Sequence, residues 1–161
     1  MILFKRFNTR VSNGFSLIEM AMAIALAGIV GVVAIPYFVD FRNDAKIIVT
    51  QDRMQTLKLA IVGDNRVVAG GTYVTPGFYQ DMGRLPTALS ELVTQGAMTT
   101  YDPINRTGWR GPYVDTSQVA NYAVDAWNTT FVYSTSPRFI RSWGPNAANN
   151  NGAGDDITLN Y

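Results

Sequence analysis

The sequence Gly14-Phe15-Ser16-Leu17-Ile18-Glu19-Met20 leads into a run without charged residues that extends from Met20 to Val39. A helix of about twenty residues is roughly 30 Å long, which matches the hydrocarbon core of a bilayer. The residues before Gly14 are basic and include no acid: Lys5, Arg6 and Arg10. A secretory signal peptide has its apolar core before the cleavage site, whereas here the apolar run follows the junction. The stretch therefore predicts a membrane-spanning helix whose basic leader stays in the cytoplasm, with the remaining chain exported.

The junction resembles the class III signal of type IV pilins and of the pseudopilins of type II secretion. That motif is a glycine, an aromatic residue, Ser or Thr, Leu, Ile and Glu, and residues 14–19 meet all six positions. The resemblance implies that a prepilin peptidase cuts after Gly14 and methylates the new amino group of Phe15. It also implies that Glu19 pairs with the amino terminus of an adjacent subunit, which would set the axial register of a filament.

A carboxylate in an apolar helix has a cost of its own. Glu19 is the one charged residue near the start of the run, and a lone charge in a membrane helix costs a few kcal/mol or more unless a partner is near. The alternative is a side chain that reaches interfacial water.

Together, the junction and the apolar run predict three parts of the chain: a cleaved leader, residues 1–14; a transmembrane and assembly segment, residues 15–41; and a periplasmic domain, residues 42–161.

The segment after Gly14 reads as one long helix from Phe15 to about Ala69, ended by Gly70-Gly71. Pro36 lacks a backbone donor, and we expect it to kink or loosen the helix near the outer edge of the membrane. In the second half an apolar stripe at helical spacing predicts the face that packs on the domain: Ile47, Met54, Leu57 and Ile61.

The rest of the chain predicts a small antiparallel sheet. Residues 130–134 and 139–142 have strand composition and flank a turn at Pro137, and residues 157–159 form a short last strand. A short helix is expected over residues 87–93. One long helix packed on this sheet is an α+β fold, and the resemblance implies the pilin fold.

The loop Ser142–Ile157 is rich in Asn and Gly and ends in adjacent carboxylates. Calcium takes six to eight oxygens from carboxylates, amide side chains and carbonyls. The loop resembles the calcium loop of major pseudopilins, which implies Asp155 and Asp156 as ligands and Asn146 in place of the first aspartate. Asn146 brings no charge, so weaker binding is expected. The alternative is a surface loop in which both aspartates only form turn hydrogen bonds.

Composition narrows the classes of function. The chain has neither Cys nor His, which excludes disulfides, thiol nucleophiles, Ser-His-Asp triads and the usual zinc sites. Four arginines near aromatic residues could bind single-stranded DNA: Arg106, Arg110, Arg138 and Arg141. However, without its leader the chain has ten basic residues against twelve acids, which gives a nucleic-acid partner no support.

The sequence thus predicts a non-enzymatic subunit of a helical filament in the bacterial inner membrane, most simply a type II secretion pseudopilin. The implied partners are copies of itself, other pilin-like subunits, prepilin peptidase, and an assembly platform with a separate cytoplasmic ATPase. The chain itself has no phosphate-binding glycine loop with lysine. The alternatives are a type IV pilus subunit for motility, adhesion or DNA uptake, and a membrane-anchored periplasmic enzyme or binding protein.

Overall fold

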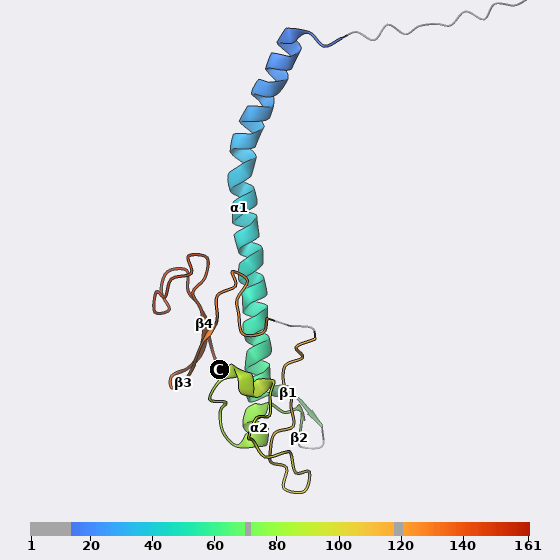
Figure 1. The fold of residues 1–161 in the computed structure, drawn as a ribbon, viewed down its shortest axis with the longest axis vertical. Coiled ribbons are helices and arrows are strands. Elements are labelled where there is room, and N and C mark those ends of the chain that lie inside the picture. The colour runs from blue at the N-terminus through green and yellow to red at the C-terminus, as the bar shows by residue number, and fades with distance from the viewer. Residues whose placement is uncertain (1–13, 70–71, 118–120) are drawn as a thin grey trace, which may run out of the picture. The chain divides into compact units, whose positions relative to one another are not determined.

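The computed structural model describes residues 14–69, 72–117 and 121–161. Residues 1–13 of the predicted leader lie outside these ranges, and so do Gly70 and Gly71, which were expected to end the long helix. The described chain divides into two compact units, one ending at Phe41 and the other comprising Arg42–Tyr161. The elements in chain order are α1 (Leu17–Val62), β1 (Asp64–Ala69), β2 (Thr72–Thr75), α2 (Phe78–Met82), the 3-10 helix η1 (Leu89–Leu92), β3 (Val132–Thr135), β4 (Arg138–Ser142) and β5 (Ile157–Asn160). Figure 1 labels all of them except η1 and β5.

The long helix is confirmed, but its predicted end at Ala69 is wrong. α1 ends at Val62 because Gly63 takes a left-handed φ of 79°, with its N–H donating to the Leu59 carbonyl at 2.8 Å. A left-handed residue after the last turn is the usual helix stop, and glycine adopts it without strain. α1 continues through position 36 without a break. The expected kink or loosening at Pro36 stays a prediction.

The residues expected to continue the helix form a hairpin instead. β1 pairs antiparallel with β2, with Asp64 opposite Thr75 and Ala69 opposite Thr72, and the register shifts between the two ends. The short helix α2 follows and was not predicted. The expected helix over 87–93 is confirmed as a tighter 3-10 turn, η1.

The C-terminal sheet agrees with the sequence prediction. Its strand order is β3-β4-β5, and both pairs are antiparallel. Thr135 lies opposite Arg138 across the turn at Pro137, as expected, while β3 begins two residues later than the predicted start at Thr130. A long helix and a small antiparallel sheet together make an α+β arrangement.

The core of the domain lies against the second half of α1. Met54, Leu57 and Ile61 are almost fully buried and Ile47 is half-buried, which confirms the predicted stripe. Burying each such side chain contributes about 1.5–3 kcal/mol. The stripe packs against buried residues of later elements: Phe78, Leu89, Leu92, Val114, Phe131 and Ile140. Residues from α2, η1, the loops and the sheet therefore share one core.

Candidate functional site

The first turn of α1 is built around Glu19. The Ser16 hydroxyl accepts a hydrogen bond from Ile18 N, and the Glu19 carboxylate accepts one from Ser16 N at 2.7 Å. This pattern resembles a capping box, in which a serine before the helix and a glutamate three residues later satisfy donors that the helix leaves free, except that the serine accepts from the second helical residue instead of the third. Glu19 therefore stabilises the start of its own helix, which the sequence analysis did not predict. The Ser-x-x-Glu spacing of residues 16–19 is the sequence signal from which this cap could have been predicted.

The helix between Glu19 and Phe41 presents apolar side chains on all sides. Leu17 is 89% exposed and Val32 is 76% exposed, and the other large apolar side chains of the segment are also exposed. Within the described residues, α1 is the one helix long and apolar enough to cross a membrane. This half-helix buries almost nothing within its own chain, which suits it to a surrounding of lipid or of other helices.

Aromatic and charged residues mark the far end of the apolar run. Tyr37, Phe38 and Phe41 are exposed, and the first charges after the run are Asp40 and Arg42. Aromatic rings favour the headgroup region of a bilayer. The composition therefore changes from membrane-like to water-exposed within one to two turns, where the second compact unit begins.

The loop between β4 and β5 brings two of the predicted calcium ligands together. Asp155 accepts from Asn146 N at 2.9 Å through Oδ2 and from the Asn146 side-chain amide at 2.6 Å through Oδ1. Asp156 Oδ2 accepts from Asn150 N at 3.1 Å and Gly152 N at 2.7 Å. Both carboxylates thus order the loop through its amides, and calcium binding by these residues stays a prediction.

The donor set of this loop fits calcium in kind. Its side chains offer carboxylate and amide oxygens, and Asp156 Oδ1 is buried without a hydrogen-bond partner. A buried carboxylate oxygen with no donor is unfavourable unless a cation or water meets it. Across residues 14–69, 72–117 and 121–161, no three acidic side chains gather into one group, so an ion here would depend on amide and carbonyl oxygens as well.

A buried carboxylate at the base of the loop was not singled out from the sequence. Asp125 is 1% exposed; its Oδ1 accepts from Trp127 N at 2.9 Å and Thr129 N at 2.8 Å, and its Oδ2 accepts from the Ser142 hydroxyl. Ser142 in turn accepts from Gly144 N at 3.0 Å. This chain of bonds ties the turn after Asp125 to the end of β4 and the start of the loop.

The same turn is fastened to α1 from the other side. The Arg53 guanidinium donates to the carbonyls of Val124 and Asp125, both at 3.0 Å, and the Thr50 hydroxyl accepts from Ala126 N at 3.1 Å. The turn around Asp125 therefore joins α1, the end of β4 and the candidate ion loop. An aspartate followed by a turn was visible in the sequence, but its partners were not.

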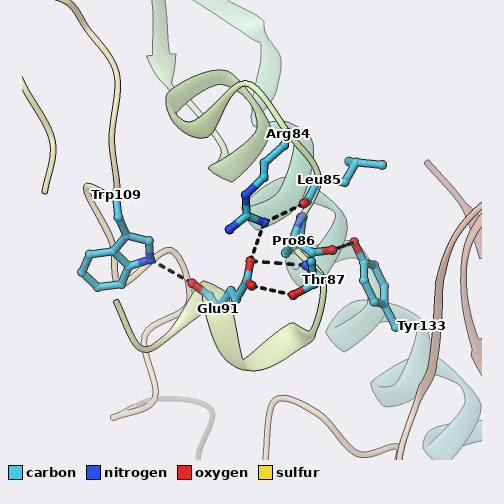
Figure 2. Close-up of polar contacts among 7 residues, drawn as sticks. All are labelled: Arg84, Leu85, Pro86, Thr87, Glu91, Trp109 and Tyr133. Carbon is cyan, nitrogen blue, oxygen red and sulfur yellow. Dashed lines mark hydrogen bonds and ion pairs between the residues drawn. The ribbon is translucent and has the colours of Figure 1, made fainter. Parts of the chain in front are cut away.

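A second polar network holds η1 to its neighbours, as Figure 2 shows. The Glu91 carboxylate accepts from Arg84 Nη1 at 2.7 Å and from the Thr87 hydroxyl, and the Glu91 carbonyl accepts from Trp109 Nε1 at 2.8 Å. Burial raises the pKa of Glu91, but the bonds from Arg84 and Thr87 outweigh it and leave this pKa below its usual value. Tyr133 completes the network by donating to the Pro86 carbonyl at 2.9 Å. These bonds hold the segment Arg84–Thr87, which leads into η1, in place.

A third network uses one of the arginines that the sequence raised for nucleic acid. Arg110 forms a two-pronged pair with buried Asp81, at 2.7 and 3.1 Å, and the Tyr113 hydroxyl donates to Asp81 at 3.0 Å. Burial, together with the Asp81 charge, raises the pKa of Tyr113 to about 12. Arg141 likewise lies over the Phe139 ring and donates to Thr158. These two arginines have partners within the domain.

Comparison of this chain with models of protein families, with characterised proteins and with solved structures finds no match.

Proposed function

We propose that this chain is a pilin-like filament subunit with the pilin fold, most simply a pseudopilin of a type II secretion system. The observation that carries the proposal is the division of α1 into two halves. Residues before Arg42 expose apolar side chains all round, while Met54, Leu57 and Ile61 are buried in the core of the domain. Such a helix is suited to membrane insertion in one state and to packing among neighbouring helices in another.

Processing would create the contact that assembly needs. Prepilin peptidase cuts after Gly14 and methylates Phe15, leaving a positively charged amine close to the start of α1. In the uncut chain the Glu19 carboxylate already accepts the Ser16 N–H. We propose that in the filament Glu19 pairs with the amine of a neighbouring subunit, so that two charges are neutralised in an apolar surrounding.

The proposed location follows from the charges at the two ends of the apolar run. The leader with Lys5, Arg6 and Arg10 stays in the cytoplasm, the helix crosses the bacterial inner membrane once, and the domain lies in the periplasm. Head-to-tail contacts between such subunits extend without closing, which produces a filament. An assembly platform and a separate cytoplasmic ATPase supply the energy.

Three variants separate the two roles of Glu19. Glu19→Gln keeps an oxygen that can accept the Ser16 N–H but removes the charge, Glu19→Leu removes both, and Ser16→Ala weakens the cap while keeping the charge. We expect both Glu19 variants to insert and to be cut after Gly14 but to form no filaments, whereas Ser16→Ala assembles. The measurements are electron microscopy of sheared filaments and mass spectrometry of the mature amino terminus.

Two results would count against the proposal. Filaments of Glu19→Gln as abundant as those of the parent would show that no charge pair is needed. A mature chain that begins anywhere but Phe15 would remove the processing step. Deleting the gene then distinguishes the two filament classes, since loss of exoprotein release indicates a pseudopilus and loss of twitching indicates a type IV pilus.

We further propose that the loop between β4 and β5 binds calcium through Asp155, Asp156 and Asn146. The ion would order the loop and the adjoining end of the sheet and would have no catalytic role. An ion that binds only the folded state raises its stability. We expect millimolar calcium to raise the melting temperature of the full chain in detergent, and to do so less for Asp156→Ala. Equal melting temperatures with calcium and with chelator would eliminate the site.

A further inference from the structure

The pair Asn151–Gly152 in the loop between β4 and β5 carries chemistry that the proposed function does not use. Glycine after asparagine leaves the side-chain amide carbon unhindered, so the backbone nitrogen of residue 152 can attack it. The attack forms a carbon–nitrogen bond and closes a succinimide ring, and ammonia leaves with the proton of the Gly152 N–H. Water then opens the ring at either carbonyl to give aspartate or isoaspartate.

The folded loop holds the attacking nitrogen. Gly152 N donates to Asp156 Oδ2 at 2.7 Å, and the same oxygen accepts from Asn150 N at 3.1 Å. Asn151 N donates to the Asn149 side chain at 2.9 Å. Ring closure requires the Gly152 nitrogen to give up its proton and to turn toward the Asn151 side chain. Its bond to a carboxylate opposes both changes, because such charge-assisted bonds are stronger than neutral ones.

The fold also explains why a vulnerable pair occurs here. Gly152 has a φ of 85°, and a Cβ at this position would lie 2.9 Å from an Arg141 guanidinium nitrogen. Arg141 is itself held by Thr158 and the Phe139 ring. Asn151 has a φ of 56°, which asparagine tolerates better than most residues. The turn therefore needs glycine at 152 and favours asparagine at 151.

We propose that Asn151 is a site of spontaneous deamidation and that Asp156 suppresses the reaction by holding the Gly152 N–H. Conversion occurs when this bond opens, so the rate follows the open fraction of the loop. The product places a third carboxylate in the loop beside Asp155 and Asp156. The inference does not depend on filament assembly or on calcium.

The test compares full-length protein, in detergent and with a chelator present, against a synthetic peptide of residues 146–155 that lacks Asp156. Peptide mapping by mass spectrometry follows the conversion of Asn151 to aspartate and isoaspartate during incubation at neutral pH. We expect the parent protein to convert at least about ten-fold more slowly than the peptide. Asp156→Ala should convert several-fold faster than the parent, and Asp156→Asn, which keeps an acceptor oxygen, should lie between the two.

Asp155→Ala is the matched control, since it removes the bonds to Asn146 but leaves the bond between Gly152 and Asp156 intact. It should convert clearly more slowly than Asp156→Ala, because the Gly152 N–H keeps its acceptor. Conversion of the parent at the peptide rate would overturn the proposal. So would Asp156→Ala, or Asp156→Asn if the alanine variant does not fold, converting as slowly as the parent. If Asp155→Ala accelerates the reaction as much as Asp156→Ala does, general loop order protects Asn151 and the specific role of Asp156 is wrong.

Discussion

Replacing Asp125 with alanine tests whether the turn at the base of the candidate ion loop is a main fastening of the domain. The Asp125 carboxylate is 1% exposed and accepts hydrogen bonds from Trp127 N, Thr129 N and the Ser142 hydroxyl. Alanine would leave these three donors without an acceptor in a place that water hardly reaches. An unsatisfied buried donor costs about 1–3 kcal/mol.

We therefore expect Asp125→Ala to lower the free energy of unfolding by about 3–5 kcal/mol. Three unsatisfied donors would together cost about 3–9 kcal/mol, but local relaxation and entering water recover part of this loss. Domains of this size are stable by only about 5–15 kcal/mol, so the variant should lie near the limit of folding. In a thermal scan the melting temperature should fall by roughly 12–20 °C.

The assay is urea denaturation of the full chain in detergent, followed by tryptophan fluorescence. All three tryptophans lie in the unit Arg42–Tyr161, so the signal reports the domain rather than the apolar half-helix: Trp109, Trp127 and Trp143. Asp125→Asn is the gentler variant, because its amide oxygen can still accept from Trp127 N and Thr129 N. It should cost less than alanine.

Asp102→Ala is the matched control. The Asp102 carboxylate also accepts local bonds, from Ile104 N at 2.8 Å and from the Asn105 side chain, but these bonds are exposed to solvent. The same truncation there should change stability far less. A loss for Asp125→Ala no larger than that for Asp102→Ala would refute the reasoning, since burial would then add nothing to the cost.

Two further predictions concern the core and the alkaline limit. Leu57→Ala, at a side chain 1% exposed, should lower the free energy of unfolding by about 2–5 kcal/mol in the same urea titration, whereas Leu59→Ala, at 38% exposure, should cost much less; equal costs would contradict the assigned helix face. For Tyr113, burial raises the pKa from 10.0 to about 12, so folding favours the neutral phenol. The contribution of Tyr113 to the free energy of unfolding is complete below pH 10 and is lost as the pH rises toward 12. Between these pH values the melting temperature of Tyr113→Phe should therefore fall less steeply with pH than that of the parent. Equal slopes for the two proteins would show that Tyr113 does not contribute.

The sequence alone was enough to predict the elements that depend on the pattern of neighbouring residues. The charge-free run before Asp40 and the spacing of Met54, Leu57 and Ile61 predicted a long helix with an apolar first half and a core-facing second half. Alternating and β-branched residues around Pro137 predicted the hairpin of β3 and β4. These features depend on periods of two and 3.6 residues, which can be read from neighbouring positions.

Other features depended on residues distant in the chain. The helix was expected to reach Ala69, but Gly63 ends it where α2 closes over it: a Cβ on Gly63 would lie 2.7 Å from Gly77 N. Asp81 pairs with Arg110 twenty-nine positions away, and Arg53 reaches the Asp125 carbonyl seventy-two positions away. Sequence showed that these residues were charged and gave no way to choose their partners.

The candidate sites divide in the same way. The Ser16–Glu19 spacing and the Asp155–Asp156 pair are visible as short motifs, because each acts within a single turn or loop. Whether a carboxylate is buried, which donors it meets and which of its oxygens is left free depend on the packing of separate segments. That packing is set by the shared core, in which side chains from distant parts of the chain must fit together at high density. Only the tertiary structure shows how they do so.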